Sequence, residues 1–176
     1  VCMAQGNLDL AKEHLLESLR YHDLLGRDAA GKAHVMLLLS QLFSIVGDLE
    51  QLHNVVSELV KMANHEYKEL DEVLKHAHIA RALQDIAKGD LGRAIATLEA
   101  LITDERVALT TPSSSYIIAW RLLAYAYVWL YELTRYRAKG EKAIAILSEI
   151  ADFAQEYDLY VLEAQMTLLL SYLYSS

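Results

Sequence analysis

The sequence predicts an all-α protein, an α-solenoid (superhelix) of about eight antiparallel helices that forms one domain over residues 1–176. Of the 176 residues only 7 are Gly and 1 is Pro, while 54% are hydrophobic, a composition that favours helix and can fill a core. A three-residue phrase, Gly-Asn/Asp-Leu, begins at Gly6, Gly47 and Gly89, at intervals of 41 and 42 residues. Such a fixed period is typical of repeat proteins. Between the phrases, apolar residues recur at helical spacing.

The recurring phrase has the chemistry of a tight turn between two helices. Glycine reaches the left-handed backbone region without a Cβ clash, so it ends a helix. The Asn or Asp that follows accepts hydrogen bonds from the free N–H groups of the next helix, so it starts one. After Asp48, Gln51 adds the spacing of a capping box. Because connections this short join antiparallel neighbours, each phrase predicts a helical hairpin.

Four helices are predicted in the first half of the chain, over 8–25, 28–46, 49–66 and 69–88. Gly26 ends the first, and Asp28 can cap the second, which is apolar up to Gly47. The third is amphipathic. Its apolar face consists of Leu52, Val55, Val56, Leu59 and Met62. The boundary near residues 64–69 holds neither Gly nor Pro, and Gly89 closes the fourth helix.

Four more helices are predicted in the second half, over 91–103, 112–135, 141–157 and 160–174. Thr111-Pro112 is a start signal for the second of them, with Thr as cap and Pro in the first turn, and the serines at 113–115 could act one turn later. That helix is apolar almost all round, which predicts burial. A break near Ala138–Gly140 separates it from an amphipathic helix, and the last helix is again nearly all apolar.

Helices of two kinds alternate along the chain. Those before a Gly-Asp turn are apolar on several sides, and those after it are apolar on one side. In a two-layer solenoid the first kind is sandwiched between neighbours and the second kind faces water. Since no single hairpin can bury both kinds of face, the hairpins are expected to stack on one another.

The residues at the packing positions resemble the tetratricopeptide repeat. That family carries an aromatic, a Leu-Gly pair and a Tyr in its first helix, and two small residues around a large one in its second. Trp120, Leu123, Ala124 and Tyr127 match the first-helix spacing, and Ala94, Leu98 and Leu101 match the second-helix spacing. Small residues also recur at one first-helix position, at Ser40, Ala82, Ala124 and Ser171.

The resemblance implies a right-handed superhelix whose first helices line a concave surface. The period near 42 exceeds the family's usual value of about 34. Longer repeats of this kind are similar to the sensor domain of the maltose-regulon type of bacterial activator, and to helical repeats in eukaryotic assembly subunits. In this register neither end has the polar capping helix that a solenoid needs, so we expect flanking repeats of the same parent chain.

The resemblance places seven side chains on the concave surface, between the packing positions: His34, Gln41, Arg121, Tyr125, Trp129, Gln165 and Tyr172. In the same register, His76 joins them. Tyr, Trp and Arg are the residue types that dominate interface energies. Tyr125 and Trp129 fit a core role in long helices equally well, whereas the charge of Arg121 in so apolar a helix needs water or a partner.

The sequence holds no motif that indicates catalysis, a cofactor or a metal. Among the seven histidines no pair is four residues apart, and Glu72 with His76 supplies only two ligands. The single cysteine, Cys2, lies outside any catalytic motif, and adjacent acids such as Asp71 and Glu72 do not face each other. We therefore predict a protein that is not an enzyme and has no cofactor or metal.

Charge and cysteine content bear on partners and compartment. The net charge of −8 argues against direct nucleic-acid binding, because phosphates need an excess of Lys and Arg. The apolar stretch over 116–131 contains Arg121 and is too short to span a bilayer. One cysteine and no signal peptide fit a reducing compartment. We expect an intracellular, cytoplasmic protein (nuclear if eukaryotic) with no membrane partner.

Two functions remain open from the sequence. The first is a non-catalytic protein–protein interaction scaffold or adaptor that binds a peptide or helix on its concave face. The second is an effector-sensing regulatory domain of a larger signal-responsive transcription regulator. A sensor needs a closed pocket with convergent polar groups, whereas a scaffold needs a long open groove.

Overall fold

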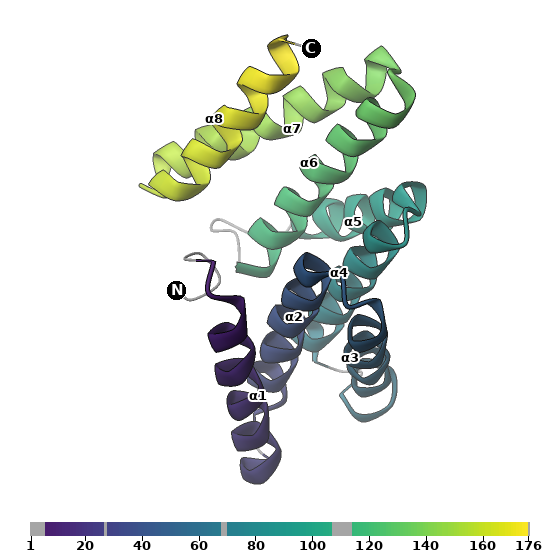
Figure 1. The fold of residues 1–176 in the computed structure, drawn as a ribbon, viewed down its shortest axis with the longest axis vertical. Coiled ribbons are helices and arrows are strands. Elements are labelled where there is room, and N and C mark those ends of the chain that lie inside the picture. Colours follow the sequence, from purple (N-terminus) through teal and green to yellow (C-terminus); the bar gives the residue numbers. More distant parts are fainter. Residues whose placement is uncertain (1–5, 27, 68–69, 107–113, 176) are drawn as a thin grey trace. The chain divides into compact units, whose positions relative to one another are not determined.

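The computed structural model describes residues 6–26, 28–67, 70–106 and 114–175, and every regular element in them is helical. The elements are α1 (Leu8–Leu25), α2 (Ala29–Val46), α3 (Leu49–Lys61), the π-helix η1 (Met62–Glu66), α4 (Asp71–Ala87), α5 (Leu91–Arg106), α6 (Ser114–Thr134), α7 (Arg137–Glu156) and α8 (Tyr160–Ser175). The all-α prediction is confirmed (Figure 1).

Contacts between helices divide the chain into two compact units, Val1–Asp90 and Leu91–Ser176. In the first unit α2 packs against α1, α3 and α4, and α3 also packs against α4 (Figure 1). Its core is built from aliphatic side chains of α2, α3 and α4, among them Met36, Leu39, Leu52, Leu59 and Ile79. The packing of α2 on α4 is a contact between two helices that the repeat register assigns to the same layer.

Three predicted turns of the first unit have the predicted chemistry. Gly47 adopts φ 75°, in the left-handed region, and its N–H donates to the Phe43 carbonyl to end α2. The Asp48 side chain then accepts a hydrogen bond of 3.1 Å from the backbone N–H of Gln51 and starts α3. Asn7 and Asp28 cap α1 and α2 in the same manner.

The third predicted helix, 49–66, does not run as one α-helix to its end. Its last turn is π-helical, and the Tyr67 N–H donates to the carbonyl of Met62, five residues back. With neither Gly nor Pro at this boundary, the chain leaves the helix by widening its last turn. The fourth helix was predicted from residue 69, which lies outside the described residues; the structure begins α4 at Asp71.

In the second unit α6 packs against α5 and α7, and α8 packs against α7 (Figure 1). α5 extends to Arg106, three residues beyond its predicted end at 103. The start signal at Thr111-Pro112 lies outside the described residues, and α6 begins at Ser114, within the alternative start at 113–115. Leu98, Leu147 and Ile150 are fully buried in this unit.

The break predicted near Ala138–Gly140 is wrong. The chain turns at Arg135, which adopts φ 51°, and α7 begins at Arg137. Gly140 lies inside α7, where an added Cβ would come within 2.9 Å of the Tyr131 ring of α6. This glycine therefore permits close approach of two helices and does not end one.

In the described part of the chain, α2 is the one helix long and apolar enough to cross a membrane. Eight of its side chains, including Met36, Leu39 and Phe43, are buried within the first unit. α2 packs against three other helices of that unit. Its apolarity thus matches its place between three other helices of the unit.

Candidate functional site

Two of the predicted site residues, His34 and Gln41, lie on α2 of the first unit. They are seven residues apart on one helix face, and both are half-buried. Nδ1 of His34 lies 3.4 Å from Nε2 of His76 on α4, and the ring centroids are 5.3 Å apart in an edge-to-face arrangement. His76 is only 4% exposed. The packing of α2 on α4 therefore brings these two histidines together as a contact between helices, and His76 does not line an open surface.

The surroundings of His76 favour its uncharged state. Burial, followed by the neighbouring His34, lowers the pKa of His76 below its ordinary value of 6.5. Glu72, one turn earlier on α4, acts in the opposite direction without outweighing burial. Protonation of both rings would place two positive charges against each other in a poorly solvated contact. The pair can thus form one ring-to-ring hydrogen bond only while at least one imidazole stays neutral.

Gln41 carries an unused hydrogen-bond donor. Its side-chain Nε2 is buried and has no hydrogen-bond partner among the described residues. An unpaired buried amide costs about 1–3 kcal/mol, so such groups usually have a partner in the working protein. One helical turn further along α2, the Ile45 side chain is exposed. This end of α2 thus combines an unpaired donor with an apolar surface.

In the second unit, α6 places Arg121, Tyr125 and Trp129 at successive four-residue steps, on one face of the helix. Arg121 and Tyr125 are half-buried, and Trp129 is 52% exposed. Trp120 and Tyr127, at the packing positions of the repeat register, are buried, as predicted for core residues. We refer to the three residues Arg121, Tyr125 and Trp129 as the α6 face.

Arg121 is the most unusual group on the α6 face. Its Nε atom is buried and has no hydrogen-bond partner among the described residues. A guanidinium has five N–H donors in a planar fork suited to carboxylates and carbonyls. Because a buried donor of a charged group is costly when unpaired, Arg121 is a group that a ligand could satisfy.

The last two predicted site residues, Gln165 and Tyr172, lie on α8 and are exposed. They are seven residues apart on one helix face. Within the described residues, α6 and α8 both pack on α7 but do not pack closely on each other, in contrast to α2 and α4. The second unit therefore carries the α6 face and the α8 residues on separate helices with α7 as their common neighbour.

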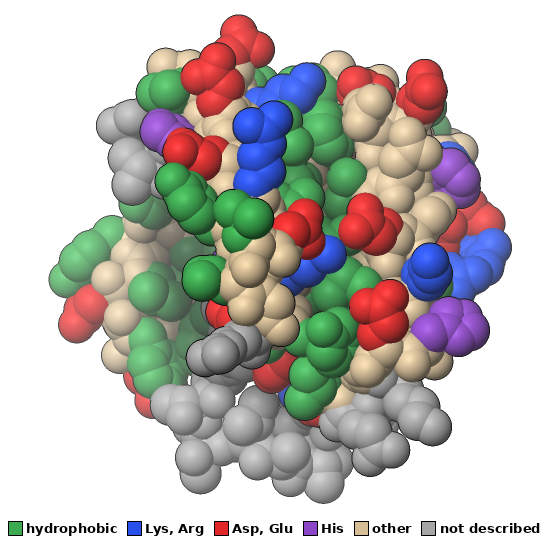
Figure 2. Space-filling view, turned by 90° about the horizontal axis from the view of Figure 1, so that it is seen from below, with side chains coloured by type: hydrophobic (Ala, Val, Ile, Leu, Met, Phe, Trp, Pro, Cys, Tyr) green, Lys and Arg blue, Asp and Glu red, His purple; other side chains and the backbone are tan. Residues whose placement is uncertain are grey.

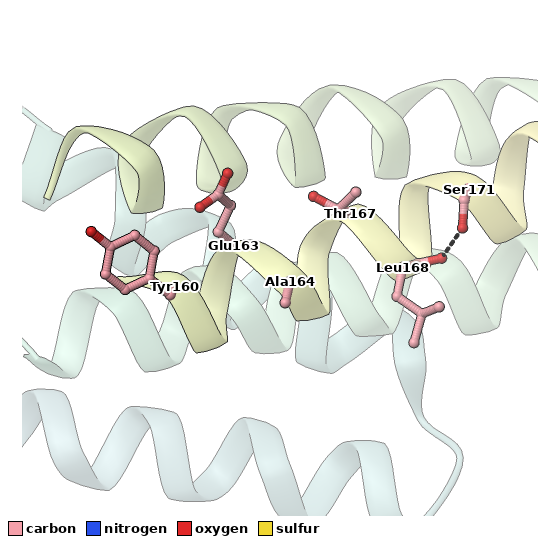
Figure 3. Close-up of a pocket in the computed structure, with 6 residues that line it drawn as sticks. All are labelled: Tyr160, Glu163, Ala164, Thr167, Leu168 and Ser171. Atoms are coloured by element: carbon pink, nitrogen blue, oxygen red, sulfur yellow. Dashed lines mark hydrogen bonds between the residues drawn. The ribbon is translucent and has the colours of Figure 1, made fainter. Parts of the chain in front are cut away.

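The sequence missed how little of α8 is covered. A helix apolar on all sides was expected to be buried, but only Met166 and Leu173 of α8 are buried. A recess of about 520 Å³ runs along α8 (Figure 3). It is lined by Tyr160, Glu163, Ala164, Thr167, Leu168 and Ser171. Apolar periodicity does not predict this difference from α2, because both helices are apolar on most sides, whereas α2 packs against three helices and α8 against one.

A polar joint ties α5, α6 and α7 together. Glu99 of α5 accepts hydrogen bonds from the Tyr127 hydroxyl at 2.7 Å and from Lys142 Nζ at 2.6 Å. Burial raises the pKa of Glu99, but the hydrogen bonds from Lys142 and Tyr127 outweigh it, so that the pKa lies below its ordinary value. The Lys142 ammonium also sits 5.2 Å from the centre of the Tyr127 ring. This joint fixes the orientation of α6 within the unit.

The surface shows mixed charge. Figure 2 shows carboxylates, Lys and Arg interspersed among hydrophobic side chains on one face of the molecule. Among the described residues, no three His, Cys, Asp or Glu side chains lie close enough together to hold a metal ion. What the described residues do present is a set of aromatic, aliphatic and unpaired polar groups on helix faces.

The protein is thus, by its structure, an all-helical protein whose helices pack on one another within each unit. Comparisons with known protein families, curated proteins and solved structures found no match to this chain.

Proposed function

We propose that this protein is a non-catalytic interaction module that binds an extended peptide or a helix of another protein on the inner side of a tetratricopeptide-like, right-handed helical superhelix. Its action requires no bond to be made or broken. The partner's side chains would occupy the faces presented by the first helices of the repeats, with flanking repeats of the parent chain extending the same surface.

The observation that carries the proposal is the buried, unpaired Nε of Arg121 on the same helix face as the half-exposed Trp129. Arg and Trp are the residue types most often found at interface hot spots. A peptide carbonyl or carboxylate would pair with the guanidinium, and an apolar side chain would cover the indole. The unpaired Nε2 of Gln41 on α2 supports the same assignment for the first unit.

The contact of α2 with α4 supports the repeat arrangement, because it joins two helices that the register assigns to one layer. The cavities favour a scaffold over a small-ligand sensor. One is the open recess along α8, and another, lined by Tyr131, Arg137, Glu141 and neighbours, has about 220 Å³. A small-molecule site usually encloses its ligand in about 300–1,000 Å³ with convergent polar groups, whereas the larger of these two is open to solvent and the smaller lies below that range.

A binding selection tests the proposal. The intact protein is used to select binders from a displayed library of random peptides of about 16 residues, long enough to form four helical turns. Peptides that recognise the α6 face are expected to bind wild type and to lose about 30-fold or more in affinity for the Arg121→Ala/Trp129→Ala double variant. Binding should also shift the fluorescence of Trp129 to shorter wavelength, because the indole leaves water.

The matched control is Leu24→Ala, which removes an exposed apolar side chain (82% exposed) from α1 of the first unit. It should leave peptide affinity unchanged. The double variant should keep the far-ultraviolet helical signal of wild type. Peptides that bind wild type and the double variant equally, or a double variant that unfolds, would refute the placement of the site on the α6 face.

A further inference from the structure

The α6 face continues by one further residue toward the end of its helix. Leu133 follows Trp129 by the same four-residue step and is 76% exposed. We refer to Arg121, Tyr125, Trp129 and Leu133 as the α6 ridge. Exposure increases along the ridge, from the half-buried Arg121 and Tyr125 to the more exposed Trp129 and Leu133. The ridge therefore carries one cation at its more buried end and large apolar side chains at its open end.

Arg121 differs from its neighbouring cations in having no carboxylate beside it. Among the described residues its guanidinium forms no ion pair, and its Nε is buried without a hydrogen-bond partner. Every other Lys or Arg of α6 and α7 has a carboxylate or an aromatic ring against it: Arg135 pairs with Glu132, Arg137 with Glu141 and Lys142 with Glu99, and Lys139 lies over the Tyr127 ring. The ligand group that best matches an unpaired guanidinium is a carboxylate, which accepts two of its N–H groups at once.

The apolar part of the ridge decides the backbone conformation of the ligand. The backbone N–H and C=O groups of α6 are used within the helix, so they are not offered to a bound chain. An extended peptide lying across Trp129 and Leu133 would therefore bury its own backbone groups without hydrogen bonds. A helix pairs its backbone groups internally and can pack on such a face with side chains alone. The ridge thus favours a helical ligand.

The ridge also sets the spacing of side chains within the ligand. Arg121 and Trp129 are eight residues apart, which is about 12 Å along the axis of α6. On a helix laid along the ridge, the two side chains that contact them lie seven or eight residues apart. An extended chain covers the same distance in about four residues. The two conformations therefore predict different sequence patterns.

We propose that the α6 ridge binds one amphipathic helix of a partner protein. An Asp or Glu of that helix pairs with Arg121, and a large apolar side chain seven or eight residues away packs on Trp129 and Leu133. This proposal rests on the interaction function proposed above and adds the conformation and the charge of the partner. Because the chain has a net charge of −8, further acidic residues in the partner are repelled, so the acidic preference is confined to one position.

The peptides selected from the displayed library of random sequences test the proposal. Those that lose affinity for Trp129→Ala should carry one Asp or Glu seven or eight residues from a Leu, Ile, Phe or Trp. As synthetic peptides, they should gain helical far-ultraviolet signal on binding. Arg121→Met removes the charge and keeps an unbranched side chain, and it should weaken their binding by about 10- to 100-fold.

A double-mutant cycle tests whether the two charges meet. Replacing the acidic residue of a peptide by its amide should weaken binding to wild type about as much as Arg121→Met does, and should cause little further loss in that variant. The matched control is Arg20→Met, which removes the same charge from an exposed position on α1 of the first unit. It should leave the affinity unchanged. Two losses that simply add would show that the carboxylate binds elsewhere and would overturn the proposal.

Urea unfolding of the free protein separates a binding role of Arg121 from a structural one. Because its Nε is unpaired, Arg121→Met should unfold at the same urea concentration as wild type or at a higher one. Unfolding at a clearly lower concentration would assign Arg121 to the stability of the fold and contradict the proposal.

The selection also distinguishes this proposal from the function on which it rests. Peptides that need Trp129 but carry no acidic residue, and that bind Arg121→Met as tightly as wild type, would sink the acidic helix and leave the interaction function standing. So would peptides with the four-residue spacing and no gain of helical signal, because they bind as extended chains. Peptides that bind every variant equally would remove the α6 face as a binding site, and both proposals with it.

Discussion

Arg121 and His76 show that two residues assigned to the same predicted surface can have different outcomes. Both were placed on the inner surface by the repeat register. His76 is closed off by His34, whereas Arg121 keeps a buried nitrogen without a partner among the described residues. The register fixes where each side chain leaves its helix, but the neighbouring helix decides whether that position is filled. For this reason the sequence could predict which residues lie on this surface, but it could not predict which of them remain open to a ligand.

The histidine pair predicts a pH-dependent stability. Because the pKa of His76 is lowered in the folded protein, the unfolded chain binds a proton below about pH 6.5 that the folded chain refuses. The free energy of unfolding should therefore be at its full value above that pH and should fall as the pH drops from 7.5 to 5.5. Urea unfolding at each pH measures the effect, which amounts to about 1.4 kcal/mol per unit of pKa difference.

The control for this effect is His34→Gln, which removes the second imidazole and its charge and should reduce the slope of stability against pH. Glu99 does not contribute in this window. The pKa of its carboxyl is lowered from 4.5, so the stability it adds is lost only as the pH falls below that value. A wild-type stability that rises on acidification from 7.5 to 5.5 would contradict the assignment.

At the scale of elements, glycine takes part in two different ways. Gly47 and Gly89 end helices with positive φ, at +75° and +82°. Gly140 lies within α7 and lets the helix approach the Tyr131 ring. The helix-ending glycines can be predicted from the local sequence, because an Asp follows each of them and starts the next helix. The role of Gly140 depends on the Tyr131 ring, which lies nine residues earlier and across a turn. The local sequence could not reveal this contact, so the helix break was predicted at Gly140 and not at Arg135.

Gly140→Ala should destabilise the protein although it replaces glycine in a helix with the best helix former. The new Cβ would meet the Tyr131 ring at 2.9 Å, and overpacking of this kind costs about 1–3 kcal/mol against a gain of about 1 kcal/mol in helix propensity. Thermal and urea unfolding measure the difference. Gly92→Ala in α5 is the control, because nothing lies within 4 Å of its added Cβ, and it should be neutral or stabilising.

Restoring space should rescue the first variant. Adding Tyr131→Ala to Gly140→Ala removes the ring, so the double variant should lose less stability than the two single changes added together. Strict additivity would mean that the two side chains do not compete for the same space.

The element scale also explains why α8 was misjudged. Periodicity reports which sides of a helix are apolar, and both α2 and α8 are apolar on most sides. α2 has three helices around it, and α8 has one. Burial depends on the count of neighbours, which is a property of the packing and not of the segment. Helix positions and caps were therefore predictable from the sequence, whereas the open side of α8 was not.

At the scale of the whole molecule, acidic residues exceed basic ones by 24 to 16. Excess charge of one sign destabilises a compact state through self-repulsion. Raising NaCl from roughly 20 to 500 mM shortens the Debye length to a few ångströms and screens that repulsion. The free energy of unfolding in urea should therefore rise with salt.

Glu13→Lys on α1 provides the matching variant, since Glu13 is exposed and the substitution lowers the acidic excess by two charges. It should stabilise the protein at low salt and reduce the effect of added salt. A stability that declines steadily as NaCl rises would indicate that attractive ion pairs, and not the net charge, dominate the electrostatics of the folded state.

The turn at Gly47-Asp48 is held entirely by atoms within a few residues of it. The Gly47 and Asp48 N–H groups donate to the Phe43 carbonyl, and the Asp48 carboxylate holds the N–H of Gln51. These hydrogen bonds do not depend on a distant helix. A chain whose turns are formed locally can gain or lose a whole hairpin by duplication or deletion, and each remaining helix still begins and ends at the same residues. The number of hairpins can therefore change through evolution without disturbing the turns that remain.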